Sequence, residues 1–374
     1  MAESHALTQL SFSEGLVITQ SGNRVSIVDP RQLIAMTAIE SLPFHKLREF
    51  LRWKNLKRNP ELALLCFSLT AVLIGRSLHL PTSPPDPGFV KAVLFHYIFP
   101  LAFAIVVHLA ILIRSQSRRR DSVIVLGLSI PTLFVVAYCH FQCKVWMPFV
   151  NPHRFGALYE SVDRIFSPIV ELCGNFVASM DGAGLDVSGA YHLWFILFFF
   201  VCFGLHTLRD TPTGQRQVIL GVGWILALGG VGYWIAPAVG PFIYRHGADS
   251  NASLIQNYMW QKFHLLVLTR HIPAGYFLAA PAAMPSLHVA HAAFLVWMLR
   301  RLSRGLSLVF FPLLLWFAVT AVGLAWHYIV DVPAGFLLAA FVVMLVKKTL
   351  PDPETHESLE PVVDDIIAGD LIPA

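Results

Sequence analysis

The sequence predicts an all-α fold, a polytopic membrane helix bundle with about eight spans. Of its 374 residues, 56% are hydrophobic and 13% are charged, and the mean hydropathy is +0.62. Such a composition is too apolar and too poor in charge for a soluble domain of this length. The apolar residues also gather into stretches close to the ~20 residues that a membrane-spanning helix needs.

Each expected span is an apolar stretch bounded by charged or loop-forming residues. The sixth is short and the last two nearly adjoin, so the number of spans is approximate. The expected spans are 61–78, 93–113, 122–138, 192–208, 218–238, 286–299, 306–326 and 328–346.

Lys and Arg indicate which loops face the cytoplasm, because they accumulate on that side of a membrane. The set of loops that contains the N-terminus holds basic clusters at 46–58, 114–120 and 300–304. The opposite set holds only scattered basic residues, namely Lys91, Lys144, Arg154, Arg164, Arg245, Lys262 and Arg270. We therefore expect both termini in the cytoplasm and the long loops 140–191 and 239–285 on the opposite face.

The chain is expected to have four parts. Residues 1–44 form a small cytoplasmic extension, in which 16–20 and 24–28 suggest a hairpin. Residues 45–121 hold the first two spans, preceded at 44–57 by a basic amphipathic interfacial helix or, as a nearly equal alternative, a solvated lead-in, and 122–348 form the main membrane domain. The acidic tail 349–374 is expected to be disordered. No secretory signal peptide is visible, so the first span is expected to act as the insertion signal.

The stretch WHYIVD holds the first pair of residues with catalytic potential. His327 and Asp331 are four positions apart, so on a helix they would lie one turn apart on one face. A carboxylate bonded to one imidazole nitrogen sets the tautomer and makes the other nitrogen a better nucleophile or base. A buried polar pair that only joins two helices is an equally good interpretation of this pair alone.

A second group lies in AMPSLH, at the start of the sixth expected span. Pro285 suits a first helical turn, whose free N–H groups form an anion site. Ser286 and His288 would then face a bound phosphate, whereas His291 is expected to be a packed neighbour. Because the sixth and eighth spans both begin on the non-cytoplasmic side, His288, His327 and Asp331 are expected at one membrane face.

Metal catalysis is the main mechanistic alternative. Two-metal phosphatases need clustered carboxylates, and Asp163, Asp249 and Asp331 show no DxD or DxxD pattern. A single zinc ion on His288, His327 and Asp331 stays open as a less favoured arrangement, and the five cysteines show no metal-ligand spacing.

These motifs resemble those of a known superfamily. MPSLH and WHYIVD are similar to the second and third motifs of the type 2 phosphatidic acid phosphatase (PAP2) superfamily. A first motif is visible as Lys144-x6-Asn151-Pro152. Asn151, the segment RFGALYESVDRIF and the segment 234–241 are most similar to the inositol phosphorylceramide synthase branch. The resemblance covers 144–335 and implies a six-helix core, a metal-independent reaction, His327 as nucleophile and His288 as acid.

Two departures from the superfamily pattern bear on the substrate. The usual arginine of the first motif is replaced by Asn151, and Thr320 and Ala321 stand where the third motif has Ser-Arg. Two guanidinium groups that clamp a phosphate dianion are therefore missing. A phosphodiester carries one negative charge and needs less neutralisation, although Arg245, Lys262 and Arg270 offer possible compensation.

We therefore expect a lipid phosphotransferase that moves a phospho-head group from a phospholipid to a lipid alcohol. The alternative is a phosphatase acting on phosphatidate or a polyprenyl diphosphate, and a transporter or scaffold is a less favoured third class. Lys144, Ser286, Asn151 and Arg245 are the expected phosphate ligands. No cofactor and no nucleic acid is expected, the partners are lipids in the bilayer, and a bacterial inner membrane is preferred to Golgi or endoplasmic reticulum.

Overall fold

The computed structural model describes most of the chain in two compact units, Met1–Arg58 and Asn59–Ala374. Described residues of the first unit are the strands at 9–10, 17–21 and 24–28. Those of the second unit are 59–82, 87, 90–91, 95–96, 99–114, 119–245, 247, 249–273 and 280–351.

The first unit contains a three-stranded antiparallel sheet in the order β1-β2-β3. Its strands are β1 (Gln9–Leu10), β2 (Val17–Ser21) and β3 (Arg24–Val28). β2 pairs with β3 from Val17 opposite Val28 to Ser21 opposite Arg24, which confirms the predicted hairpin. The predicted interfacial helix at 44–57 and nearly all of the predicted disordered tail lie outside the described residues.

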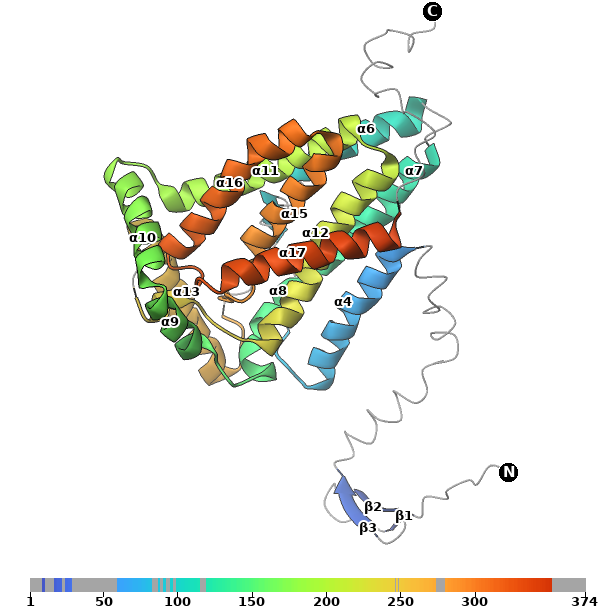
Figure 1. The fold of residues 1–374 in the computed structure, drawn as a ribbon. Helices are drawn as coiled ribbons and strands as arrows, with labels where there is room; N and C mark the ends of the chain where they lie inside the picture. Colours follow the sequence, from blue (N-terminus) through green and yellow to red (C-terminus); the bar gives the residue numbers. More distant parts are fainter. Residues whose placement is uncertain are drawn as a thin grey trace, which may run out of the picture. The chain divides into compact units, whose positions relative to one another are not determined.

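The described residues of the second unit form helices joined by turns and loops, with no strand among them (Figure 1). Its helices are α4 (Pro60–Ser77), α6 (Phe99–Arg114), α7 (Arg119–Ile124), η2 (Val125–Ser129), α8 (Ile130–Val150), α9 (Gly156–Ile165), α10 (Ser167–Gly182), α11 (Val187–Arg209), α12 (Pro212–Ile235), η3 (Pro241–Ile243), α13 (Ser250–Thr269), α15 (Leu287–Leu302), α16 (Arg304–Gly323) and α17 (Asp331–Thr349).

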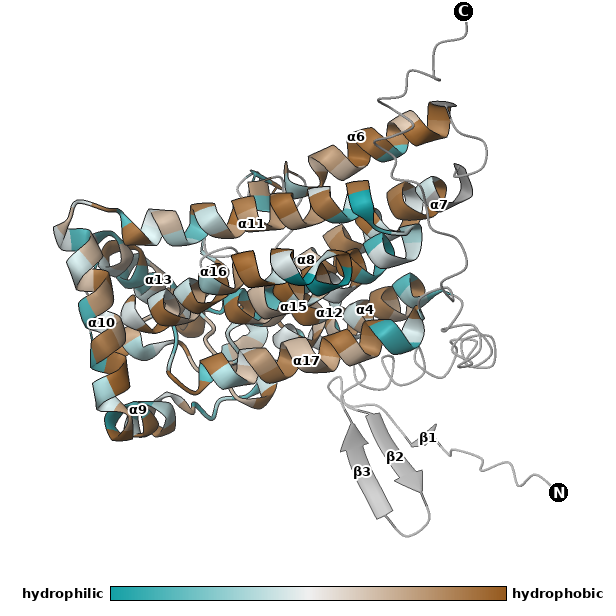
Figure 2. Ribbon diagram, turned by 45° about the horizontal axis from the view of Figure 1, so that its top comes forward, coloured by the Kyte–Doolittle hydropathy of each residue, from teal (hydrophilic) through white to brown (hydrophobic). Residues whose placement is uncertain are grey.

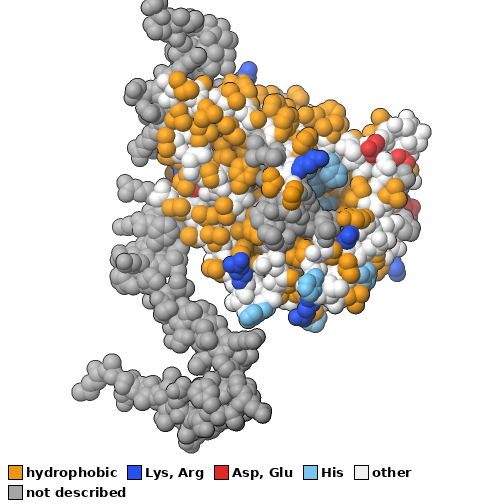
Figure 3. All heavy atoms as spheres, turned by 180° about the vertical axis from the view of Figure 1, so that it is seen from behind, with side chains coloured by type: hydrophobic (Ala, Val, Ile, Leu, Met, Phe, Trp, Pro, Cys, Tyr) orange, Lys and Arg blue, Asp and Glu red, His pale blue; other side chains and the backbone are white. Residues whose placement is uncertain are grey.

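Six helical segments in the described part of the chain are long and apolar enough to cross a membrane. They are Pro60–Ser77, Ser122–Val150, Val187–Arg209, Pro212–Ile235, Arg304–Gly323 and Asp331–Thr349. The other two expected spans correspond to α6 and α15, which have 16 residues each. Hydrophobic residues run along α6, α11, α16 and α17 (Figure 2) and cover much of the face seen in Figure 3. These features confirm the predicted polytopic helical bundle.

α12 is the central helix of the bundle and packs against α8, α15, α17 and α4. In the apolar 18-residue stretch of α12, 72% of the residues are buried inside the bundle, against 28% in the corresponding stretches of α16 and α17. Glycines let its neighbours approach closely, since an added Cβ on Gly221 would meet the ring of Phe294 and one on Gly229 would meet Leu287. Small residues commonly bring membrane helices into such close contact, because there is no hydrophobic driving force between helices in lipid.

The helices that are not expected spans gather at one end of the bundle. α9, α10 and α13 lie together there, at the end where α17 begins (Figure 1). The expected loop at 140–191 is wrong in detail, because the third span continues as helix to Val150 and α9 and α10 follow it. Lys144 therefore lies in a helix, where its side chain can face the interior of the bundle.

Candidate active site

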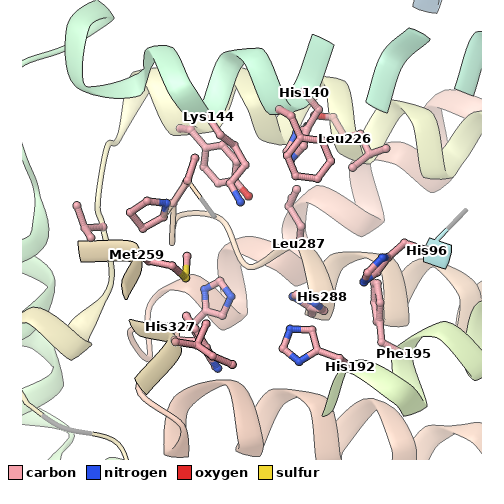
Figure 4. A pocket seen from close by; sticks show the side chains of 18 of the residues that line it. His96, His140, Lys144, His192, Phe195, Leu226, Met259, Leu287, His288 and His327 are labelled. Carbon is pink, nitrogen blue, oxygen red and sulfur yellow. Dashed lines mark hydrogen bonds between the residues drawn. The ribbon is translucent and has the colours of Figure 1, made fainter. Parts of the chain in front are cut away.

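A cavity of about 460 Å³ lies inside the bundle and is lined by the histidines of the second and third motifs. Its wall includes His288 and His327, and on another side His140 and Lys144 (Figure 4). The remaining described lining residues are largely aromatic or aliphatic, and they come from α8, α11, α12, η3, α13, α15 and the segments between these helices. A mostly apolar cavity with a few convergent polar groups is the usual form of a ligand site.

His327 lies in a turn between α16 and α17, and its ring is held by two acceptors. Its Nδ1 atom is 2.9 Å from the carbonyl oxygen of Ala283 and 3.2 Å from Oδ2 of Asp331. A carbonyl oxygen can only accept a hydrogen bond, so Nδ1 must carry the proton. In the neutral ring Nε2 is then unprotonated and has a lone pair available as a nucleophile.

The prediction that a helix places His327 and Asp331 on one face is wrong, although the two side chains do meet. α17 begins at Asp331, and Ala325 has a φ of 58°, a left-handed conformation that interrupts the helix before His327. The carboxylate of Asp331 folds back instead, accepting from the backbone N–H of Tyr328 at 2.9 Å. The turn, and not helical periodicity, therefore brings the carboxylate to the imidazole.

Asp331 is completely buried. Oδ2 accepts the bonds from His327 and Tyr328, whereas Oδ1 has no partner among the described residues. A buried carboxylate that orients an imidazole also stabilises the positive charge that develops on the ring during reaction.

Backbone bonds join the second and third motifs directly. The Ala283 carbonyl holds His327, and the Ser286 N–H donates to the carbonyl of Asp331 at 3.2 Å. Close approach of the two segments depends on Gly335, because an added Cβ there would lie 2.6 Å from the Ser286 carbonyl oxygen. His327, Asp331 and the start of α15 thus form one connected unit.

His288 is the second residue of α15, which begins one residue later than the sequence predicted. Ser286 is the N-cap residue, so Pro285 lies outside the first turn. The Ser286 side chain is fully buried, its hydroxyl has no partner among the described residues, and it does not line the cavity. Its backbone N–H donates to the carbonyl of Asp331, so neither polar donor of Ser286 faces the cavity.

Three rings from α11 surround His288, and they are not among the site residues predicted from the sequence. The centroid of its ring lies 4.5 Å from that of Phe195, 4.7 Å from Tyr191 and 6.0 Å from His192. The ring of His288 makes no hydrogen bond to another described residue, and it is therefore available to a ligand. The sequence signal was the aromatic run YHLWF at the start of an expected span.

Lys144 and His140 lie one turn apart on α8 and both line the cavity. His140 donates from Nδ1 to the carbonyl of Leu226 at 2.8 Å, which fixes its ring. The Lys144 ammonium lies 5.7 Å from the ring centroid of Phe141 and has no carboxylate partner in the described part of the chain. His291, predicted to be a packed neighbour, is buried and also borders the cavity.

The other two expected phosphate ligands lie away from the cavity. Asn151 is the C-cap of α8, and its amide donates to the carbonyl of Trp234 at 2.9 Å. Arg245 forms ion pairs with Asp163 and Glu160 on α9. Both residues therefore make structural contacts, and neither lines the cavity.

No group of three or more His, Cys, Asp or Glu side chains within the described residues is arranged to hold a metal ion. His288, His327 and Asp331 accordingly do not form a ligand set of the kind that the zinc alternative needs.

Comparison with known proteins gives one match. Residues 169–345 match a family model described as the PAP2 superfamily, and the matched region includes both histidine motifs but begins after Lys144 and Asn151. No curated protein and no solved structure matches the chain. The superfamily consists of phosphatases and phosphotransferases, so the match supports an enzyme of that type.

Proposed function

We propose that the protein is a membrane lipid phosphotransferase, which moves a phospho-head group from a phospholipid donor to a lipid alcohol through a phosphohistidine on His327. The observation that carries the proposal is which nitrogen of the His327 ring carries the proton. Ala283 and Asp331 hold Nδ1 in its protonated form, which leaves Nε2 as the nucleophile in a cavity shared with His288. A nucleophile oriented in this manner by a third group is typical of covalent catalysis.

The reaction proceeds in two displacements at phosphorus. In the first, Nε2 of His327 forms a bond to phosphorus while the bond to the donor's leaving oxygen breaks, and His288 transfers a proton to that oxygen. In the second, the acceptor hydroxyl gives its proton to His288 and its oxygen bonds to phosphorus, and the Nε2–phosphorus bond breaks. Acid–base catalysis of this kind contributes about 10² to 10⁴-fold to the rate.

The charge of the cavity favours a phosphodiester donor. Lys144 is the one Lys or Arg among the described lining residues. The proposed compensating residues have other partners: Arg245 pairs with Asp163, Lys262 lies over the ring of Tyr258, and Arg270 lies over Phe149. One cation matches the single charge of a diester better than the two charges of a monoester.

We also propose that the reaction needs no metal ion, because the histidine pair supplies both the nucleophile and the acid. Activity retained after dialysis against a chelator would support this, and loss restored by zinc would contradict it.

The decisive experiment provides purified protein in lipid nanodiscs with a phospholipid labelled in its head-group phosphate. With a lipid alcohol present, we expect label in a new lipid; without it, we expect label to accumulate on the protein as acid-labile, base-stable phosphate. Neither product should form with His327→Ala. If His327→Ala turns over substrate at the wild-type rate, the proposed mechanism is excluded.

A lipid phosphatase is the second candidate, since the matched superfamily includes phosphatases. In that reaction, water would take the place of the lipid alcohol in the attack on the phosphohistidine. Rapid release of free phosphate from a monoester substrate without a lipid alcohol would favour it over the transferase.

A further inference from the structure

One face of α9 packs against the turn that carries His327. Gly156, Tyr159 and Asp163 are spaced by three and four positions, so they lie along one side of the helix. The rings of Tyr159 and Tyr328 meet edge to face at 5.6 Å, and an added Cβ on Gly156 would lie 3.1 Å from the Tyr328 hydroxyl. Burial, with Tyr244 and Asp331 nearby, raises the pKa of the Tyr328 phenol, which therefore stays neutral.

Asp163 makes the polar contact of this interface. Its side chain is almost completely buried, and Oδ1 accepts a hydrogen bond from the backbone N–H of Ile329 at 2.9 Å. Its other oxygen, Oδ2, accepts from the guanidinium of Arg245. That guanidinium also lies 3.6 Å from Glu160, one turn earlier on the same helix. Both oxygens of Asp163 are therefore used, so the carboxylate has little freedom to move.

The turn needs such support because it lies outside any helix. Within the third motif, Asp331 holds the N–H of Tyr328 and Asp163 holds the N–H of Ile329. These two residues directly follow His327. Two buried carboxylates therefore set the path of the backbone next to the nucleophile, one from within the motif and one from a helix far away in the sequence.

We propose that Asp163, itself held by Arg245, is a positioning residue that sets the place of the His327 imidazole in the cavity. This proposal rests on the proposed function of His327. It assigns Arg245 a part in the reaction through Asp163, without contact to phosphate. An error of about 1 Å in the position of a reacting group can cost about 10²-fold in rate.

The test compares kcat and KM of Asp163→Ala, Asp163→Asn and Glu160→Gln with the wild type, in the lipid assay described above. Asp163→Ala should lower kcat about 10- to 100-fold with little change in KM, because a misplacement of the imidazole by about 1 Å costs about 10²-fold. Asp163→Asn should restore part of that loss, because its amide oxygen can still accept from Ile329. Glu160→Gln is the matched control, since it weakens the contact with Arg245 but leaves the Ile329 bond, and it should keep nearly full kcat.

A second measurement does not depend on turnover. Diethyl pyrocarbonate acylates the unprotonated Nε2 atom of histidine, and mass spectrometry of the digested protein reports the rate at His327. The rate of acylation at His327 should differ from the wild-type value in Asp163→Ala and equal it in Glu160→Gln. If wild-type protein proves inactive on lipids but this difference appears, the positioning role stands and the proposed function fails.

Unchanged kcat and unchanged His327 labelling in Asp163→Ala would overturn the proposal, as would an equal loss in Glu160→Gln. Should Asp163→Ala fail to give a monodisperse, folded protein, Asp163→Glu takes its place. That variant keeps the charge and the ion pair but moves the carboxylate by one methylene, so it should lower kcat at normal stability. Wild-type kcat in a folded Asp163→Glu would contradict the positioning role.

Discussion

Nδ1 of His327 lies 2.9 Å from the carbonyl oxygen of Ala283, 44 positions earlier in the chain. This bond ties the third motif to the residue directly before the second motif, and it uses a backbone atom that side-chain substitution does not remove. The tautomer of His327 is therefore controlled twice, once by this carbonyl and once by Asp331.

This double control makes the effect of Asp331→Asn smaller than in a triad with a single orienting group. In a Ser-His-Asp triad, where one aspartate alone orients the histidine, the change of that aspartate to asparagine costs about 10⁴-fold in kcat, because the wrong tautomer forms. Here the Ala283 carbonyl still requires a proton on Nδ1, so only the position of the ring is less well held, and we expect a loss of about 10²-fold, measured as kcat on a labelled phospholipid. Asp249→Asn, which changes a buried carboxylate that caps α13 outside the cavity, should have little effect on kcat. A 10⁴-fold loss in Asp331→Asn would show that Asp331 alone sets the tautomer.

The role of His288 as acid predicts a dependence on the leaving group. His288→Ala should lower kcat on a phospholipid by about 10² to 10⁴-fold, because the departing alkoxide is no longer protonated. A phosphodiester with a nitrophenol leaving group needs no protonation, so most of the activity should return with it. His327→Ala should stay inactive on both substrates. Equal losses of His288→Ala on both substrates would exclude the acid role.

Lys144 is expected to bind the anionic part of the donor. A hydrogen bond to a charged group contributes about 1.5 to 3 kcal/mol, so Lys144→Met should raise KM about 10- to 100-fold, whereas Lys144→Arg should keep most of the affinity. Lys262→Met removes a cation that lies over Tyr258 outside the cavity and serves as the control. Equal effects of the two methionine variants would indicate a general electrostatic effect on lipid binding.

Gly335 is expected to be intolerant of a side chain. In Gly335→Ala the new Cβ would lie 2.6 Å from the backbone oxygen of Ser286, so α15 and α17 must separate. Overpacking of this kind costs about 1 to 3 kcal/mol, and it also strains the contact between Ser286 and Asp331. Thermal unfolding in detergent measures the effect. Gly204→Ala is the matched control within a span, because its Cβ would meet only Phe103 at 3.7 Å. An unchanged melting temperature in Gly335→Ala would contradict the close packing.

Several features of the fold could be predicted because they depend on composition and local pattern. Apolar stretches of sufficient length form helices in a bilayer, since no other arrangement of a single segment satisfies its backbone groups there. The hairpin at β2 and β3 likewise follows from two short β-rich runs around Ser-Gly-Asn. Span ends were less predictable, as α8 shows, because polar residues such as Lys144 can remain helical when they face a cavity.

The candidate site likewise has features that could be predicted from the sequence and features that could not. The chemistry of His288, His327 and Asp331 is visible in the sequence, because the residue types and motifs are local. The parts played by Ala283, Asp163 and the rings of α11 are not visible, since a backbone carbonyl has no sequence signature and the other contacts join distant segments. Arg245 has the charge that suits a phosphate, but its burial against Asp163 depends on where α9 packs.

By itself, the sequence determined that the chain forms a helical bundle suited to a membrane and which residues have the chemistry for phosphoryl transfer. Only the tertiary structure decided that His327 leaves the helix, that a carbonyl sets its tautomer, and that Lys144 rather than Arg245 faces the cavity. The physical reason is that hydrophobicity and residue chemistry act locally along the chain. Orientation and charge pairing instead depend on which distant segments meet when the helices pack.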